Sequence, residues 1–147
     1  MSATTNTRRP VTVACAVCGV LNRVDLERLG AGPKCAACGR PIRLDRPVKL
    51  IEADFDRVIS GASVPIVLDC YADWCGPCRA MAPALDEFAR ARMGQTLVLK
   101  LDTDANPAIS HRLNIRSIPT LIAFRDGKES RRHVGIADLS VLDALIQ

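Results

Sequence analysis

Six of the seven cysteines in this chain of 147 residues form three Cys-x-x-Cys pairs. One pair, Cys75 and Cys78, follows the apolar run 66–68 and opens a helical pattern. Cysteines so spaced lie one helical turn apart, close enough to form a disulfide and open it again. Cys75 would face the unpaired N–H groups and the positive end of the helix dipole, which favour a reactive thiolate. Cys78 would lie a turn deeper. The residues predict a dithiol that exchanges with other disulfides, although the bare motif is as typical of metal binding.

The other two pairs are separated by sixteen residues, and a glycine follows each. This spacing is typical of a zinc ribbon, in which four thiolates hold one Zn²⁺ at tetrahedral corners. Two more redox pairs, or two disulfides, are the alternative. A segment of roughly 35 residues is too short to fold around its own apolar core, which favours the metal. Four protein ligands leave no open position for water, so we expect one structural zinc per chain. Its ligands would be Cys15, Cys18, Cys35 and Cys38.

Composition and charge exclude several classes of protein. Apolar residues make up 48% of the chain, enough for a sizeable core. The formal net charge is +4, and the basic excess lies in residues 1–47. These basic residues are scattered and no aromatic residue precedes Phe55, so we expect no nucleic-acid binding. No apolar run suits a signal peptide or a membrane span, so we expect a cytoplasmic protein without membrane contact. Cytoplasmic thiols stay reduced, which favours metal binding or redox catalysis for the cysteines.

Periodicity and turn residues divide the chain. Residues 1–10 predict a mobile tail, 11–45 a zinc-ribbon module, and 46–147 a larger domain behind a proline-bounded linker. In the larger domain we expect strands at 48–51, 64–71, 96–101, 120–124 and 129–134, and helices at 54–59, 76–93, 107–113 and from 138. A hairpin through Asp126 and Gly127 would join the last two strands. Strands alternating with helices predict an α/β fold, a mixed central sheet with helices on both faces.

Four segments, taken in order, resemble the thioredoxin family. The stretch DCYADWCGPCR at 69–79 is similar to the family's active-site signature, and the later segments are APALDE at 82–87, KLD at 100–102 and SIPT at 117–120. The resemblance covers roughly residues 48–147 and implies the thioredoxin fold. The cysteine-rich segment in front resembles the zinc-bearing branch called thioredoxin 2. The resemblance implies a thiol–disulfide oxidoreductase that reduces protein disulfides and binds no organic cofactor. It also implies an NADPH-dependent flavin thioredoxin reductase as the partner that reduces the dithiol.

The two active-site cysteines have different expected roles. Cys75 would attack a substrate disulfide, and Cys78 would resolve the mixed disulfide after losing its proton. Asp69 ends the central strand, where apolar neighbours would raise its pKa, so we expect it to accept that proton. The family places a lysine near this acid, which implies that Lys100 tunes Asp69. Strand alternation turns Cys70, the seventh cysteine, to the opposite face as a small core residue.

The resemblance also implies a substrate-contact surface. The family's proline at this position is cis, so Pro119 would expose the backbone of Ile118 for brief strand-like pairing with substrate. The remaining contact residues would form a flat apolar patch of Trp74, Gly76, Pro77 and Gly135. The alternative for Trp74 is a place in the core.

Two other functions are weighed against the disulfide reductase. Gly76 and Pro77 place no charged or imidazole group between the two cysteines, which favours a reductant over an oxidase or isomerase. Four thiolates beside a thiol-exchange site would also suit a redox sensor that releases zinc when it is oxidised.

Overall fold

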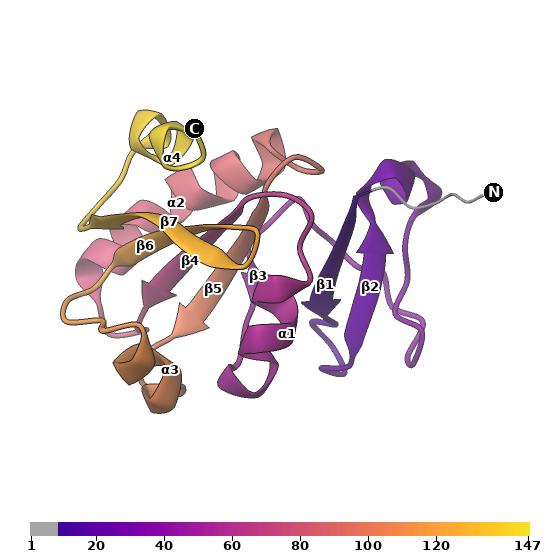
Figure 1. Ribbon diagram of the computed structural model, residues 1–147, viewed down its shortest axis with the longest axis horizontal. Coiled ribbons are helices and arrows are strands. Elements are labelled where there is room, and N and C mark those ends of the chain that lie inside the picture. The colour runs from indigo at the N-terminus through magenta and orange to yellow at the C-terminus, as the bar shows by residue number, and fades with distance from the viewer. Residues whose placement is uncertain (1–8) are drawn as a thin grey trace.

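The computed structural model describes residues 9–147, which form two β-sheets and four α-helices (Figure 1). Residues 1–8, most of the predicted tail, lie outside the described part. The tail expected over residues 1–10 is nevertheless too long, because Pro10 already begins β1 and pairs with Asp25. The elements in chain order are β1 (Pro10–Ala14), β2 (Leu21–Asp25), the 3₁₀ helix η2 (Leu26–Ala31), β3 (Val48–Lys49), the 3₁₀ helix η3 (Glu52–Asp54), α1 (Phe55–Ser60), β4 (Ile66–Tyr71), α2 (Gly76–Ala91), β5 (Leu97–Asp102), α3 (Pro107–Arg112), β6 (Thr120–Arg125), β7 (Lys128–Val134) and α4 (Leu139–Leu145).

The larger sheet has five strands in the order β3-β5-β4-β6-β7. β3, β5 and β4 are parallel, whereas β6 runs antiparallel to β4 and β7 antiparallel to β6. The central strand β4 reads IVLDCY and is buried at every position except the last, as expected of a strand covered on both faces. Between β6 and β7, φ is 51° at Asp126 and 79° at Gly127, the hairpin geometry that this dipeptide favours. The mixed sheet predicted from the sequence is confirmed.

Helices cover both faces of this sheet. On one face, Val58 of α1 and Ile109 of α3 share an apolar cluster with Leu68 of β4. On the other face, Leu85 of α2 belongs to a separate cluster with Val67 of β4 and the buried residues of α4. Figure 1 shows α2 and α4 on one side of the strands and α1 and α3 on the other. Because successive residues of β4 alternate between the two clusters, each helix pair has its own half of the core.

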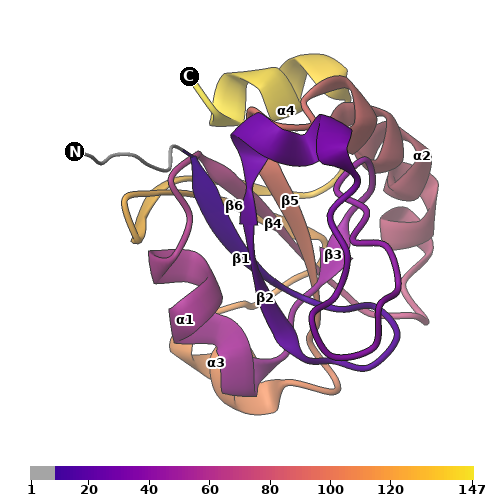
Figure 2. The same ribbon diagram turned by 90° about the vertical axis from the view of Figure 1, so that its right-hand side faces the viewer.

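The β1–β2 hairpin packs beside α1, and its core is continuous with that of the larger sheet (Figure 2). Val11 and Val13 of β1 are 0% exposed and share an apolar cluster with Phe55 of α1. A Cβ added to Gly61, just after α1, would lie 2.8 Å from Oγ1 of Thr12 in β1. The cysteine-rich segment is therefore docked firmly on the larger sheet and its helices.

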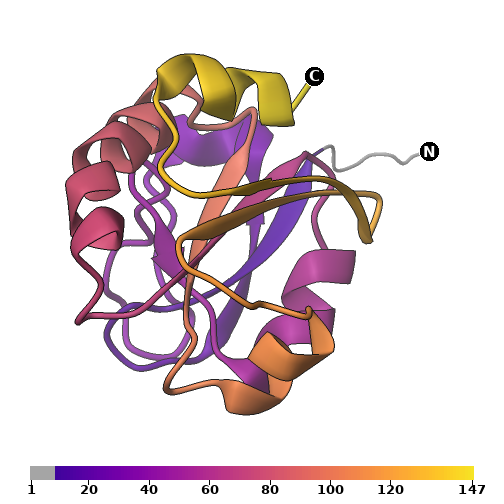
Figure 3. The same ribbon diagram turned by 90° about the vertical axis from the view of Figure 1, so that its left-hand side faces the viewer.

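The observed elements differ from the expected ones at several ends. β3 covers only Val48–Lys49, because the chain turns at Ile51 into η3, which precedes α1. α2 runs through Pro83 and ends at Ala91. β7 forms the sheet edge opposite β3, and Figure 3 views the molecule from that side. Among the described residues, none of the helices has the length and apolar character needed to cross a membrane.

Candidate functional site

The first turn of α2 holds the two cysteines of the predicted dithiol. Cys75 is the N-cap of the helix, and the N–H of Cys78 donates to Cys75 Sγ at 3.2 Å. The two residues are joined by a disulfide, and their Cα atoms lie 5.3 Å apart. The structure is thus the oxidised form. In the reduced form, the same N–H group and the helix N-terminus would stabilise a thiolate at Cys75.

Fractional exposure does not distinguish the two cysteines, although the sequence predicted a deeper Cys78. Cys75 is 3% exposed and Cys78 is 5% exposed. Their surroundings do differ. Cys75 lines a surface groove of about 550 Å³ together with Trp74 and Ile118. Cys78 lines a smaller cavity of about 130 Å³ together with Asp69. Cys75 therefore lines the surface groove, and Cys78 lines a separate, smaller cavity that also contains an acid.

Asp69 is a buried carboxyl group, 3% exposed. Among the residues that the structure describes, no group hydrogen bonds its Oδ1. Burial raises the pKa of Asp69 to about 6, and the nearby charge of Lys100 opposes part of this rise. Lys100 lies opposite Asp69 in the β4–β5 register, and its Nζ lies 4.5 Å from the centre of the Tyr71 ring. Asp69, Lys100 and Cys78 all line this smaller cavity, so the structure brings these three predicted site residues together.

A cis peptide bond joins Ile118 to Pro119, as the family resemblance implied. The carbonyl oxygen of Ile118 lies 3.9 Å from Cys75 Sγ. The N–H of Gly135 donates to the Pro119 carbonyl at 2.8 Å, and Gly135 has a φ of 103°. The loop before β6 and the end of β7 therefore meet beside the disulfide.

The surface around Trp74 and Gly135 includes residues that sequence reasoning missed. Trp74 is 68% exposed, which excludes a place in the core, and its Nε1 donates to Asp104 Oδ2 at 2.7 Å. Asp104 is thirty residues away in sequence, and no local pattern connects it to Trp74. Val134 and Ile136, at 57% and 56% exposure, flank Gly135 and extend the apolar surface. Large apolar residues exposed together at a surface mark interaction sites, but the exposure of these two is known only from the structure.

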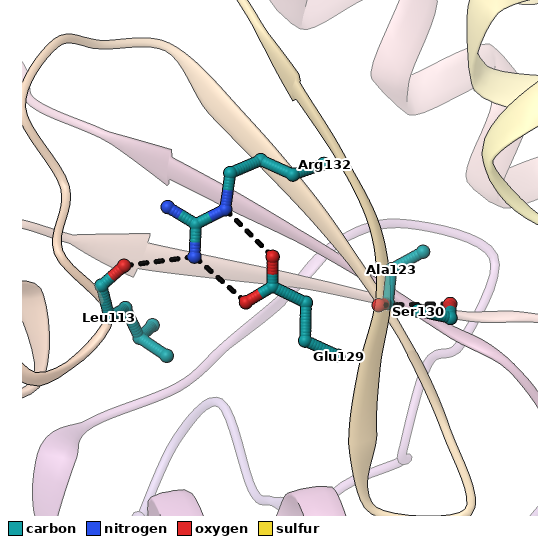
Figure 4. A network of polar contacts seen from close by, with 5 residues as sticks. All are labelled: Leu113, Ala123, Glu129, Ser130 and Arg132. Atoms are coloured by element: carbon teal, nitrogen blue, oxygen red, sulfur yellow. Dashed lines mark hydrogen bonds and ion pairs between the residues drawn. The ribbon is translucent and has the colours of Figure 1, made fainter.

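A polar network ties β7 to the end of α3 (Figure 4). Arg132 donates to both carboxylate oxygens of Glu129 at 2.8 Å and to the Leu113 carbonyl at 2.9 Å. Ser130 Oγ donates to the Ala123 carbonyl at 3.2 Å, beside the register shift between β6 and β7. The Leu113 carbonyl begins the loop that leads to Ile118 and Pro119, so this network anchors the start of that loop.

The four cysteines of the N-terminal segment, Cys15, Cys18, Cys35 and Cys38, form one cluster. Their sulfur atoms all lie within 4.8 Å of one another, with Cys15 and Cys38 3.6 Å apart and Cys18 and Cys35 3.5 Å apart. Four thiolates at tetrahedral Zn–S distances would be separated by about 3.8 Å. The spacing of the cluster therefore fits a tetrahedral zinc site.

The backbone and a buried amide favour a thiolate at Cys35, whereas Cys18 favours the thiol. A hydrogen bond from Asn22, followed by backbone N–H donors, lowers the pKa of Cys35 to about 6. Against the lowering effect of the Val20 backbone, hydrogen bonds to the neighbouring thiols raise the pKa of Cys18 to about 11. When a divalent cation binds, thiols that share protons in this way lose those protons and become four thiolates. Gly19 and Gly39, with φ of 79° and 80°, close the two turns.

The seventh cysteine lies apart from both sites. Cys70 is 0% exposed, in the cluster on the α1 and α3 face of the sheet, as strand alternation predicted. Burial, followed by the charge of Asp69, raises the pKa of the Cys70 thiol to about 12. Cys70 is therefore a protonated core residue.

Comparisons with known proteins agree with this arrangement. The family model described as "Thioredoxin" matches residues 46–147, and the model described as "Thioredoxin 2, N-terminal", a zinc ribbon, matches residues 14–40. Thioredoxin C-3 of Corynebacterium nephridii is 38% identical over 123 residues, which is 84% of each chain. A thioredoxin of Alicyclobacillus acidocaldarius is 42% identical over 95 residues, 65% of this chain and 90% of the relative.

A solved structure also matches this chain as a thioredoxin. A mutant thioredoxin from Halobacterium salinarum NRC-1 superposes with a TM-score of 0.64 and 33% identity, covering 71% of this chain and 91% of that one. The dithiol at the tip of α2, the fold and these relatives support disulfide exchange through Cys75 and Cys78. The chain belongs to the thioredoxin family of disulfide oxidoreductases and carries in front the cysteine cluster of the thioredoxin 2 zinc ribbon.

Proposed function

We propose that this protein reduces disulfides of other proteins in the cytoplasm, with Cys75 as nucleophile and Cys78 as resolving thiol. The observation that carries this assignment is the environment of the two cysteines: Cys75 lines the surface groove with Ile118, and Cys78 lines the separate, smaller cavity with the buried Asp69. A flavin-dependent thioredoxin reductase that draws on NADPH would restore the dithiol. The chain would comprise a zinc-ribbon module at 11–45 and a thioredoxin domain at 46–147.

The reaction has two exchange steps. The Cys75 thiolate attacks one sulfur of the substrate disulfide, the substrate S–S bond breaks, and the leaving sulfur departs as a thiolate that takes a proton from solvent. Cys78 then passes its proton to Asp69, and its thiolate attacks Cys75 Sγ. The mixed disulfide breaks, the second substrate thiolate leaves, and the protein is left with the Cys75–Cys78 disulfide that the structure contains. Two electrons have moved from the dithiol to the substrate.

Asp69 suits the role of proton acceptor. Its oxygen Oδ1 is buried without a hydrogen-bond partner among the described residues, and its pKa of about 6 lies near the operating pH. Burial raises this value, and Lys100 would tune it by limiting the rise, because its positive charge favours the ionised carboxylate. Asp69 therefore receives a proton readily without remaining protonated at neutral pH.

The surface around Cys75 suits an extended substrate segment. The cis bond before Pro119 leaves the backbone of Ile118 beside the disulfide, where one substrate residue can pair with it as in an added strand. The contact patch would consist of Trp74, Gly76, Pro77, Ile118, Pro119 and Gly135, with Val134 and Ile136 beside it. Backbone pairing with a flat apolar patch places few demands on substrate sequence.

A zinc ion would complete the front module. Cys15, Cys18, Cys35 and Cys38 would hold it, and the ion would crosslink the two turns as four thiolate ligands close its coordination sphere. With no open position the ion would take no part in disulfide exchange. Its role would be to stabilise a segment too small to fold by itself.

A turnover assay tests the proposal. The full-length protein, a thioredoxin reductase, NADPH and insulin are mixed, and NADPH consumption is followed. We expect turnover in the parent and in Cys70→Ala, which changes a cysteine outside the dithiol, and none in Cys75→Ser. Equal turnover in Cys75→Ser would overturn the assignment. In a glutathione redox buffer the pair should be mainly oxidised, whereas a pair that stays reduced would favour an oxidase.

A further inference from the structure

Asn22, the second residue of β2, is a buried amide. It lies opposite Val13 in the β1–β2 register and is 8% exposed, on the same face as the fully buried Val13. Buried amide groups need hydrogen-bond partners, and the partners of Asn22 lie in both cysteine turns. Its Nδ2 donates to the Val20 carbonyl at 3.1 Å, and its Oδ1 accepts from the Ala36 N–H at 2.9 Å.

These two bonds link the two cysteine turns, whose own backbone hydrogen bonds stay within each turn. In the first turn, the N–H of Cys15 donates to the Val20 carbonyl at 2.8 Å. In the second turn, the N–H of Cys35 donates to the Arg40 carbonyl at the same distance. Both bonds stay within one turn. Asn22 instead reaches from the end of the first turn to Ala36, the residue directly after Cys35.

The sulfur contacts across the cluster are weak bonds by themselves. Cys15 meets Cys38 at 3.6 Å and Cys18 meets Cys35 at 3.5 Å, and thiols are poor donors and poor acceptors. An amide hydrogen bond to the backbone is stronger and more directional. The geometry of the metal-free cluster therefore depends on Asn22 more than on the sulfurs.

We propose that Asn22 positions the second cysteine turn against the first and so preorganises the four sulfurs for a thiolate-preferring divalent cation such as zinc. This inference rests on the proposed zinc site. Without Asn22, the ion would have to fix the second turn itself, and the free energy of that ordering would be lost from binding. Asn22 is a positioning residue, since its partners are the ligand Cys35 and the backbone beside it and not the ion.

Asn22→Leu separates positioning from filling of the core. Leucine has nearly the shape of asparagine and suits the apolar neighbours, but it makes neither hydrogen bond. Asn22→Ala removes both the bonds and the volume. The matched control is Arg23→Ala, the next residue of β2, whose side chain is exposed. Outer-shell partners of metal ligands typically change affinity by about 10- to 100-fold, so we expect a loss in that range for both Asn22 variants.

The experiment is a titration of full-length, reduced protein with zinc in competition with a chromophoric chelator, together with the rate of zinc release to excess chelator. We expect one zinc per parent chain, weaker binding and faster release in both Asn22 variants, and parent-like values in Arg23→Ala. Thermal unfolding of the zinc-loaded proteins shows whether each variant is folded, and Asn22→Leu should remain so. If Asn22→Leu is folded and binds zinc like the parent, Asn22 only fills space and the inference is wrong. If the parent binds no zinc, the zinc site itself is refuted and the inference falls with it.

Discussion

The substitution Asp69→Asn should make the protein more stable at neutral pH and slower as a reductase. Burial raises the pKa of Asp69 from 3.8 to about 6. The folded state therefore keeps a proton that the unfolded chain has lost between these two values, so stability falls as pH rises through this window. A difference of about two pKa units corresponds to about 3 kcal/mol. Asparagine resembles the protonated acid and never ionises, so the stability of the variant does not fall as pH rises through this window.

Urea denaturation of the oxidised protein at a series of pH values measures the effect. The free energy of unfolding should be about 3 kcal/mol higher in Asp69→Asn than in the parent above pH 6. The two should converge below about pH 3, where the carboxyl group is protonated in both states. Asp86→Asn changes an exposed carboxyl that lines the same cavity as Asp69, and its free energy of unfolding should differ little from that of the parent. A difference that does not vary with pH, or a destabilised Asp69→Asn, would refute the reasoning.

Three further predictions concern the resolving step, the groove and the docked hairpin. In single-turnover mixing, release of reduced substrate by the parent should slow below pH 6 as Asp69 becomes protonated, and release by Asp69→Asn should be slow at every pH. Equal release rates in the parent and in Asp69→Asn would show that Asp69 is not the proton acceptor. Asp104→Ala removes the partner of the Trp74 indole, so KM for insulin should rise severalfold with kcat unchanged, and a fall in kcat alone would contradict this. Gly61→Ala places a Cβ 2.7 Å from the Arg57 carbonyl, so urea titration should show a loss of about 1–3 kcal/mol, with Gly30→Ala neutral.

Much of the fold could be predicted because its signals are local. The apolar run of β4 and the Asp126-Gly127 turn each specify an element within a few residues. The paired cysteine turns are equally local, since the glycine after each pair permits the positive φ that closes the turn. The ends were less certain, and Ile51 left the expected strand because the chain there turns into η3.

The remaining features depend on contacts between distant segments. The Trp74–Asp104 bond spans thirty residues, and Asn22 reaches Ala36 across fourteen. No periodicity encodes such pairs, because they arise only when the elements are packed. The cis bond before Pro119 followed from family resemblance alone, since base rates for X-Pro bonds favour trans. The shared burial of the hairpin and α1 also could not be predicted, since each segment read as a separate module.

The most direct test of the central claim is to identify the cysteine that captures the substrate. Cys78→Ser and Cys75→Ser are each reduced, mixed with insulin and examined by intact-protein mass spectrometry without reductant. Cys78→Ser should accumulate a mixed disulfide through Cys75 that dithiothreitol releases, and Cys75→Ser should accumulate little. Equal adducts on both variants, or an adduct only through Cys78, would contradict the account.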